Sequence, residues 1–158
     1  MKKILFFALT LTLLGCATTA EQVAQKAEKA KKVAAALADR HFTVEVQRMH
    51  PLRGRAVNVS YGYELTVKGD TLVSYLPYFG RAYNVPLGGG KGLNFTNRID
   101  TYHTWQPKAG LTHIEISTTN EEDTYQYSLD IFDNGSTSIS VQMRQREWIS
   151  YDGNVEVE

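Results

Sequence analysis

The sequence predicts an α+β domain that is mostly β: one N-terminal helix, then an antiparallel meander of about eight strands in a half-open barrel or a two-layer sandwich. Three observations indicate this class. Residues 21–40 contain no Gly, Pro or aromatic residue. From residue 41 onward apolar and polar residues alternate, as they do in strands with one buried face. Nine Tyr, six Phe and two Trp suit a β-rich chain.

The first residues predict an export signal that is cleaved after residue 15. Lys2 and Lys3 precede an almost wholly apolar run over residues 4–14. As a helix this run would span about 16 Å, only half of the roughly 30 Å hydrocarbon core of a membrane. We therefore expect residues 1–15 to be a signal peptide and not a transmembrane anchor.

The signal ends in Leu13-Leu14-Gly15-Cys16, which resembles the lipobox of bacterial lipoproteins. In that class the Cys thiol carries a diacylglycerol and becomes the first residue of the mature protein. We expect Cys16 to be lipidated with chains such as palmitate, and residues 16–20 to form a lipidated tether. The alternative is an ordinary secretory signal with a chance cysteine. Cys16 is the only cysteine, so the fold contains no internal disulfide.

The residues after Cys16 indicate the membrane that holds the anchor. Ala17 is not the Asp that marks retention at the inner membrane. Residues 18–22 lack the acidic run that resembles a surface-export signal. We therefore expect an outer-membrane lipid anchor, with the domain at the periplasmic face rather than the cell surface.

Residues 21–40 predict a helix with one mildly apolar face. The apolar residues recur at spacings of three and four along the chain: Val23, Ala27, Ala30, Ala34 and Leu37. Lys26, Lys29 and Lys32 lie away from that face. They form either a solvated surface or a basic face on a membrane.

Residues 41–158 predict the antiparallel β domain. Residues 57–67 alternate throughout and indicate one long strand. Gly69-Asp70 follows as a two-residue hairpin turn. The turn sets three pairs of residues opposite one another: Val67 with Leu72, Leu65 with Ser74, and Tyr63 with Leu76.

A second hairpin is predicted between residues 125–132 and 137–143. Asp133-Asn134-Gly135 is its loop, with the glycine at the left-handed position. The loop sets two pairs of residues opposite one another: Tyr127 with Val141, and Leu129 with Ile139.

The loop over residues 107–110 decides whether His103 and His113 meet. As a four-residue loop it places His103 opposite Ile114 on the inner face and His113 on the outer face. No histidine has a partner at the spacing of a helical metal site. We therefore expect no metal and no cofactor.

Composition and motifs argue against several classes of function. Without the two lysines of the signal, the chain has 15 basic and 17 acidic residues and no basic stripe, so we expect no nucleic-acid partner. The glycine-rich stretch 88–92 lacks the Ser or Thr of a phosphate loop. We interpret Asp70, Asp100 and Asp130 as solvated carboxylates. We expect no catalytic residue, and therefore a protein that is not an enzyme.

One condition would reverse that expectation. A hydrolase would require His103 or His113 within hydrogen-bond reach of a carboxylate, beside a concave pocket.

Residues 75–83 are too rich in aromatic rings for an ordinary solvated loop. Either the rings plug the open end of the sheet, or they form an exposed patch of the composition common at binding surfaces. The candidate binding patch comprises Tyr78, Phe79, Arg81 and Tyr83, next to the glycine-rich loop 85–92.

Motifs spread through the β domain carry a family resemblance: Gly69-Asp70, the run 75–83, Leu93-x-Phe95, Arg146 and Ile149-Ser150-Tyr151-x-Gly153. Together they resemble the domain-of-unknown-function 4251 family, lipid-anchored envelope proteins of Bacteroidetes-type bacteria, over roughly residues 28–155. The family has no assigned activity, so the resemblance implies one envelope domain and no site residue. In such bacteria Asp70-Thr71-Leu72 resembles an O-glycosylation signal with Thr71 as acceptor.

We therefore expect a lipid-anchored cell-envelope protein of unknown biochemical role, a non-enzymatic module that binds an envelope protein, a glycan or a lipid. The alternative is a periplasmic carrier that holds a hydrophobic ligand in a half-open barrel. A large apolar cavity would favour the carrier, whereas a filled core would favour the binding module.

Overall fold

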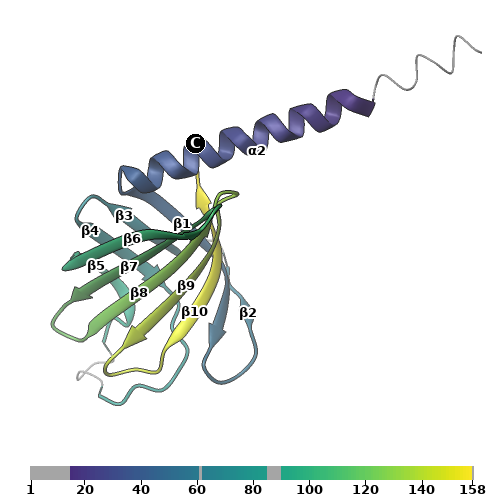
Figure 1. Ribbon diagram of the computed structural model, residues 1–158. Coiled ribbons are helices and arrows are strands. Elements are labelled where there is room, and N and C mark those ends of the chain that lie inside the picture. The colour runs from purple at the N-terminus through teal and green to yellow at the C-terminus, as the bar shows by residue number, and fades with distance from the viewer. Residues whose placement is uncertain (1–14, 61, 85–89, 158) are drawn as a thin grey trace, which may run out of the picture.

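The computed structural model describes residues 15–60, 62–84 and 90–157 (Figure 1). The predicted signal peptide lies outside the described residues except for Gly15. The side chain of Cys16 and residues 85–89 of the predicted glycine-rich loop lie outside them as well. Signal cleavage and lipidation therefore stay predictions.

Within the described residues, one long helix precedes ten strands. Helix α2 spans Gly15–Ala38, so it includes residues 16–20 as well as most of the predicted helix. The strands are β1 (His41–Pro51), β2 (Val57–Asn58), β3 (Glu64–Lys68), β4 (Thr71–Leu76), β5 (Leu93–Arg98), β6 (Thr101–Lys108), β7 (Leu111–Thr119), β8 (Thr124–Phe132), β9 (Ser136–Met143) and β10 (Ile149–Glu156).

The strands that the structure describes form one sheet in the order β5-β4-β3-β1-β10-β9-β8-β7-β6, with β2 paired to β1. Neighbouring strands are antiparallel. The sheet curls into a half-barrel, and α2 lies across one end of it (Figure 1). The predicted fold class is confirmed, and the architecture is the half-open barrel rather than the sandwich.

Hydrophobic side chains fill the inner face of the half-barrel. Alternate residues of the central strands point inward and are buried, among them Ile114 and Leu129. Val33 and Leu37 of α2 join the same cluster, whereas Val23 is 63% exposed. Since burial of one large apolar side chain contributes about 1.5–3 kcal/mol, only the C-terminal half of the helix is fastened to the sheet.

The two predicted hairpins are confirmed. Gly69 and Gly135 both have positive φ, 60° and 83°, a conformation that glycine adopts without steric cost. Four of the five predicted pairs form as expected: Val67 with Leu72, Leu65 with Ser74, Tyr127 with Val141, and Leu129 with Ile139.

The predicted strand over residues 57–67 is wrong, because the chain forms β2 and β3 with an irregular segment between them. Strand β1 has a bulge between Val46 and Arg48, and Gly62 has a positive φ of 98°. These two features bend both chains at the same level of the sheet. Tyr63 therefore precedes β3, does not pair with Leu76, and stacks on Tyr75 at 5.3 Å between ring centroids.

The predicted register of His103 is also wrong. Strand β6 continues to Lys108, which pairs with Leu111 across a tight turn. A bulge between Trp105 and Lys108 accommodates Pro107, which has no backbone N–H and is tolerated on an edge strand. His103 consequently pairs with Glu115 instead of Ile114, and it lies on the outer face of the sheet.

Candidate functional site

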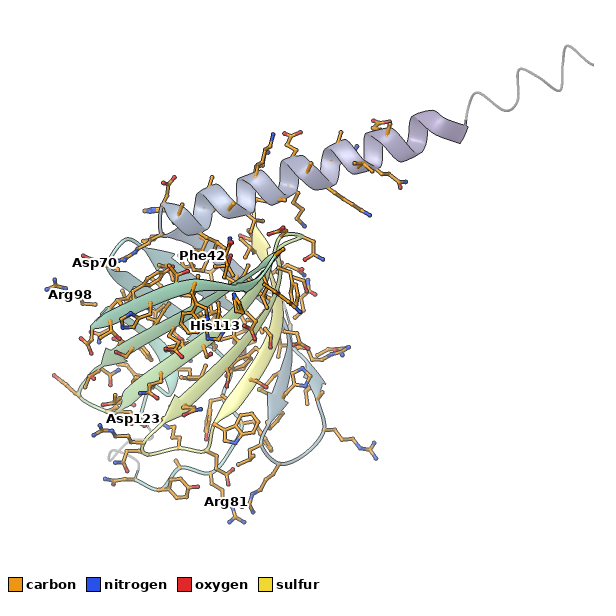
Figure 2. All side chains as sticks on the ribbon, viewed as in Figure 1. Phe42, Asp70, Arg81, Arg98, His113 and Asp123 are labelled. Carbon is orange, nitrogen blue, oxygen red and sulfur yellow. The ribbon has the colours of Figure 1, made fainter. Side chains whose placement is uncertain are left out.

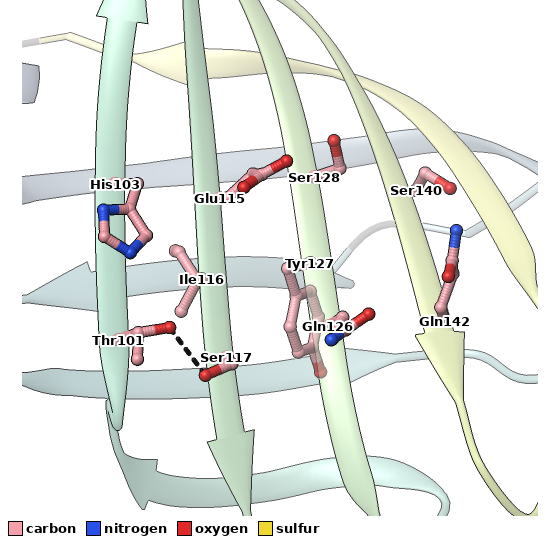
Figure 3. Close-up of a pocket in the computed structure, with 10 residues that line it drawn as sticks. All are labelled: Thr101, His103, Glu115, Ile116, Ser117, Gln126, Tyr127, Ser128, Ser140 and Gln142. Atoms are coloured by element: carbon pink, nitrogen blue, oxygen red, sulfur yellow. Dashed lines mark hydrogen bonds between the residues drawn. The ribbon is translucent and has the colours of Figure 1, made fainter.

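A surface hollow of about 320 Å³ lies on the outer face of strands β6–β9 (Figure 3). Strand pairing explains most of its composition, because outward positions of four adjacent strands lie side by side. Ile116 and Tyr127 are the exceptions, since they are 2% and 1% exposed and belong to the core. Ten residues line this outer-face hollow: Thr101, His103, Glu115, Ile116, Ser117, Gln126, Tyr127, Ser128, Ser140 and Gln142.

Hydroxyl and amide groups predominate in the outer-face hollow. Thr101 Oγ1 and Ser117 Oγ share a hydrogen bond of 2.7 Å across β6 and β7. Ser128 faces Ser140, and Gln126 faces Gln142, across β8 and β9. Among the described residues that line it there is no Lys or Arg, so the surface suits a ligand that exchanges many neutral hydrogen bonds.

Ser128, which lines the hollow, belongs to a continuous hydrogen-bonded series of three side chains. His113 Nδ1 lies 2.6 Å from Asp130 Oδ1, and Ser128 Oγ lies 3.2 Å from His113 Nε2. A carboxylate only accepts hydrogen bonds, so Nδ1 carries a proton, and in the neutral imidazole Nε2 can accept from the serine hydroxyl. Strand pairing holds the three groups, because His113 lies directly opposite Asp130 and Ser128 precedes Asp130 by two residues on β8.

The surroundings of His113 restrict its ring. The indole of Trp105 lies against it, with 4.4 Å between ring centroids and an interplanar angle of 44°. The His113 side chain is 17% exposed, whereas that of Asp130 is 48% exposed. Glu115 Oε1 lies 3.9 Å from Nε2, so a second carboxylate faces the same nitrogen as Ser128.

This arrangement meets the condition that sequence reasoning set for a hydrolase. A histidine lies within hydrogen-bond reach of a carboxylate, and Ser128 beside it lines the outer-face hollow. Asp130 was predicted as a solvated carboxylate, and Ser128 was not among the predicted site residues. The turn between β7 and β8 sets His113 opposite Asp130. The sequence of that turn was therefore the signal from which this contact could have been predicted.

A second histidine–carboxylate pair lies elsewhere on the sheet. His50 Nε2 is 2.7 Å from Asp152 Oδ2, across β1 and β10, and both side chains are more than a third exposed. Asp70 instead pairs with Arg40 at 3.6 Å. In the described part of the chain, no group of three His, Cys, Asp or Glu side chains could hold a metal ion.

The aromatic run 75–83 divides into a buried and an exposed part. Leu76 is 1% exposed and Tyr78 is half-buried, with its hydroxyl 3.0 Å from the carbonyl oxygens of Arg81 and Glu147. Burial, together with the Glu147 carboxylate, raises the pKa of the Tyr78 phenol. The phenol therefore stays a donor that fastens this segment.

The remaining rings of the predicted binding patch point outward. Phe79 is 63% exposed and Tyr83 is 69% exposed. Arg81 is exposed and lies at the end of the half-barrel opposite α2 (Figure 2). Both predicted alternatives thus hold in part, since Leu76 and Tyr78 close the sheet end while the other three residues of the patch face solvent.

The two predicted modification sites lie far apart along the chain. Thr71 begins β4 directly after the hairpin turn and is partly exposed. Cys16 is in the first turn of α2, and its side chain is outside the described residues. Both modifications stay predictions.

Comparison with known proteins places this fold in a family without an assigned function. The family model described as Domain of unknown function (DUF4251) matches residues 24–155. A crystal structure of a DUF4251 family protein from Bacteroides eggerthii is similar, with a TM-score of 0.64 and 16% identity over 85% of this chain and 91% of that one. No curated protein matches the chain. Among the described residues, no helix is long and apolar enough to cross a membrane.

Proposed function

This chain belongs to the DUF4251 family, and we propose that it is a lipid-anchored cell-envelope module that binds a glycan in its outer-face hollow. The composition of the hollow carries the proposal, because hydroxyl, amide, imidazole and carboxylate groups converge there on a rigid sheet. Function in a β fold resides in such a site rather than in the fold itself.

The chemistry of the hollow favours a neutral, hydroxyl-rich ligand. Gln126, Gln142 and the serine hydroxyls each donate and accept hydrogen bonds, which matches the alternating donors and acceptors of a sugar ring. Trp105 is 45% exposed and lies two residues from His103 on the same strand and face. Its ring offers an amphipathic surface for the C–H face of a sugar.

The proposed location rests on the signal and the lipobox. The lipid on Cys16 would hold the N-terminus of α2 in the outer membrane, at its periplasmic face. The 24 residues of α2 extend about 36 Å at 1.5 Å per residue. The helix therefore acts as a spacer, and it places the sheet within reach of envelope glycans.

A protein contact is the second role that a specific observation favours. Phe79 and Tyr83 expose large rings close along the chain to Arg81, which lies at the end of the half-barrel remote from α2 (Figure 2). Aromatic residues with Arg are enriched at interfaces. The filled inner face favours either of these roles over the hydrophobic-ligand carrier. A photoreactive residue in place of Phe79 should crosslink to an envelope protein in whole cells, and adducts confined to lipid would support the carrier instead.

Glycan binding is tested with the full chain purified in detergent. Wild type is titrated calorimetrically with neutral envelope polysaccharide fragments and with anionic fragments of the same length. Removal of two hydrogen-bonding side chains by Gln126→Ala and Gln142→Ala should weaken binding by roughly 10-fold or more, since each net hydrogen bond contributes about 0.5–1.5 kcal/mol.

The control is Ser136→Ala, an exposed position on β9 outside the residues that line the hollow. It should bind as wild type does. Equal affinity of the double glutamine variant and wild type, or binding of anionic fragments alone, would contradict the proposal.

A further inference from the structure

We propose that the outer-face hollow also hydrolyses a short acyl ester on its glycan ligand, with Ser128 as nucleophile, His113 as general base and Asp130 as the group that orients the imidazole. This inference rests on the proposed function, because the ester must first be bound in the hollow. The two hydrogen bonds of 2.6 and 3.2 Å carry it.

The order of the three groups is the one that nucleophilic catalysis requires. The carboxylate holds Nδ1–H, so the lone pair of Nε2 points at the serine hydroxyl. Both contacts are within hydrogen-bonding distance, and such contacts tighten further when substrate binds. Three adjacent positions on paired strands hold the series, and strands position side chains more rigidly than loops do.

Ser128 is accessible to a ligand, and His113 is shielded from solvent, as nucleophilic catalysis requires. Ser128 lines the hollow, so a bound ester can reach its Oγ. His113 is 17% exposed and is covered on one side by Trp105. Glu115 faces Nε2 at 3.9 Å, and its negative charge stabilises the imidazolium that forms when the serine proton is transferred.

The developing oxyanion must be stabilised by side chains. Strand β8 is paired on both sides, to β7 and to β9, so the backbone N–H groups around Ser128 are engaged in the ladders. Two side-chain donors of the hollow adjoin Ser128 on the sheet: Gln126, two residues away on β8, and Ser140, directly opposite on β9. Amide and hydroxyl side chains serve as oxyanion donors in other acyl-transfer enzymes.

The reaction balances without any cofactor. Ser128 Oγ bonds to the ester carbonyl carbon while its proton passes to His113 Nε2. The bond to the sugar oxygen then breaks, and His113 returns the proton to that oxygen, which leaves as a free hydroxyl. Water next attacks the carbonyl carbon of the acyl-enzyme and gives one proton to His113. The bond to Ser128 Oγ then breaks, His113 returns the proton to that oxygen, and the carboxylic acid is released.

The hollow also limits the acyl group. Polar side chains line most of its surface, and a long acyl chain needs an apolar pocket. Short acyl groups, such as acetyl, therefore fit as the group that passes from the sugar to Ser128.

The test uses the full chain in detergent with two probes: a fluorophosphonate that labels activated serines, and an activated aryl acetate ester. Wild type should be labelled, with peptide mapping placing the label on Ser128. Ser128→Ala should lose labelling and turnover to background. His113→Gln and Asp130→Asn should each lower turnover by roughly 100-fold or more, as loss of a general base or its orienting group does.

Controls separate chemistry from folding and from binding. Ser136→Ala should be labelled at the wild-type rate, and each variant should show the wild-type circular dichroism spectrum and unfolding midpoint. Labelling of wild type no faster than that of heat-unfolded protein, or at a serine other than Ser128, overturns the inference. If Ser128 is not labelled but wild type binds neutral glycan, the inference fails and the proposed function stands. If Ser128 is labelled but wild type binds no glycan, the proposed function fails and Ser128 is still an activated nucleophile.

Discussion

A buried hydroxyl pair inside the half-barrel gives the sharpest prediction about stability. Tyr127 of β8 donates its hydroxyl to Ser74 Oγ of β4 at 3.0 Å, and Ser74 donates to the carbonyl oxygen of Leu93 at 2.7 Å. Tyr127 is 1% exposed and Ser74 is 2% exposed. The pair therefore joins two strands that are far apart in the sheet order, across the filled core.

The two partners should not be equally costly to remove. Tyr127→Phe deletes one hydrogen bond and leaves Ser74 with its bond to Leu93, so we expect a loss of about 1 kcal/mol in unfolding free energy. Ser74→Ala removes two bonds and leaves the Tyr127 hydroxyl buried without a partner, so we expect about 2–3 kcal/mol. In the double variant neither hydroxyl of the pair remains. Its loss of unfolding free energy should therefore be smaller than the sum of the two single losses by about 1 kcal/mol.

Urea unfolding followed by circular dichroism measures these differences. Tyr75→Phe on β4 is the control, because its ring is 49% exposed and a surface change of this kind costs at most about 0.5 kcal/mol. Equal costs for Tyr127→Phe and Ser74→Ala, or strictly additive costs in the double variant, would refute the reasoning.

The same tyrosine gives a pH dependence. Burial raises the pKa of the Tyr127 phenol above its ordinary value of 10.0, so the folded state keeps the proton that the unfolded chain releases. The stability that this provides is present in full below the ordinary value of about 10 and is lost as pH rises from there toward the raised folded pKa. Tyr127→Phe should lose less stability than wild type between neutral and strongly alkaline pH, and parallel profiles would contradict this.

Three further outcomes are expected. The hydrogen bond from the backbone N–H of Lys91 lowers the pKa of Glu122, so this carboxylate stabilises the fold above about pH 4.3 and the contribution is lost as pH falls through the lowered pKa. In Glu122→Gln the free energy of urea unfolding should therefore fall less steeply toward acid pH than in wild type. Equal acid slopes of the two profiles would contradict this. A Cβ at Gly153 would collide with the carbonyl oxygen of Glu45, so Gly153→Ala should lower the unfolding free energy by about 1–3 kcal/mol; a wild-type urea midpoint would disprove the close approach. Metabolic labelling with a clickable palmitate should tag wild type and not Cys16→Ala, and a labelled Cys16→Ala would end the lipoprotein prediction.

Local signals predicted a large part of the fold. The turn at Gly69-Asp70 and the loop ending in Gly135 both gave the correct register, because a short turn of known conformation sets the pairing of the residues beside it. The helix over residues 21–40 was also predictable, because its composition and its spacing of apolar residues act within single turns.

The two wrong predictions concern segments where a β-bulge changes the pairing of neighbouring strands. The bulge in β1 between Val46 and Arg48 ended the predicted strand over residues 57–67, and alternation in one segment carries no information about a bulge in its partner. The bulge near Pro107 moved His103 to the outer face, because one extra residue in a strand reverses the face of every residue before it.

The candidate site depends on the same adjustment. His113 and Asp130 were both correctly expected on polar, outward positions, yet their contact required the pairing of β7 with β8. Ser128 carried no motif at all, because a nucleophile in a flat strand lacks the sharp turn that marks a nucleophile elbow in sequence.

The sequence by itself determined the fold class and the two hairpins, since each depends on residues that are close along the chain. For the same reason it predicts the export signal and the lipobox. Only the tertiary structure decided that the sheet is a half-barrel with a filled inner face, and that Ser128, His113 and Asp130 adjoin one hollow. The physical reason is that curvature, bulges and strand register depend on backbone pairing between distant segments, and these pairings select which side chains share a face.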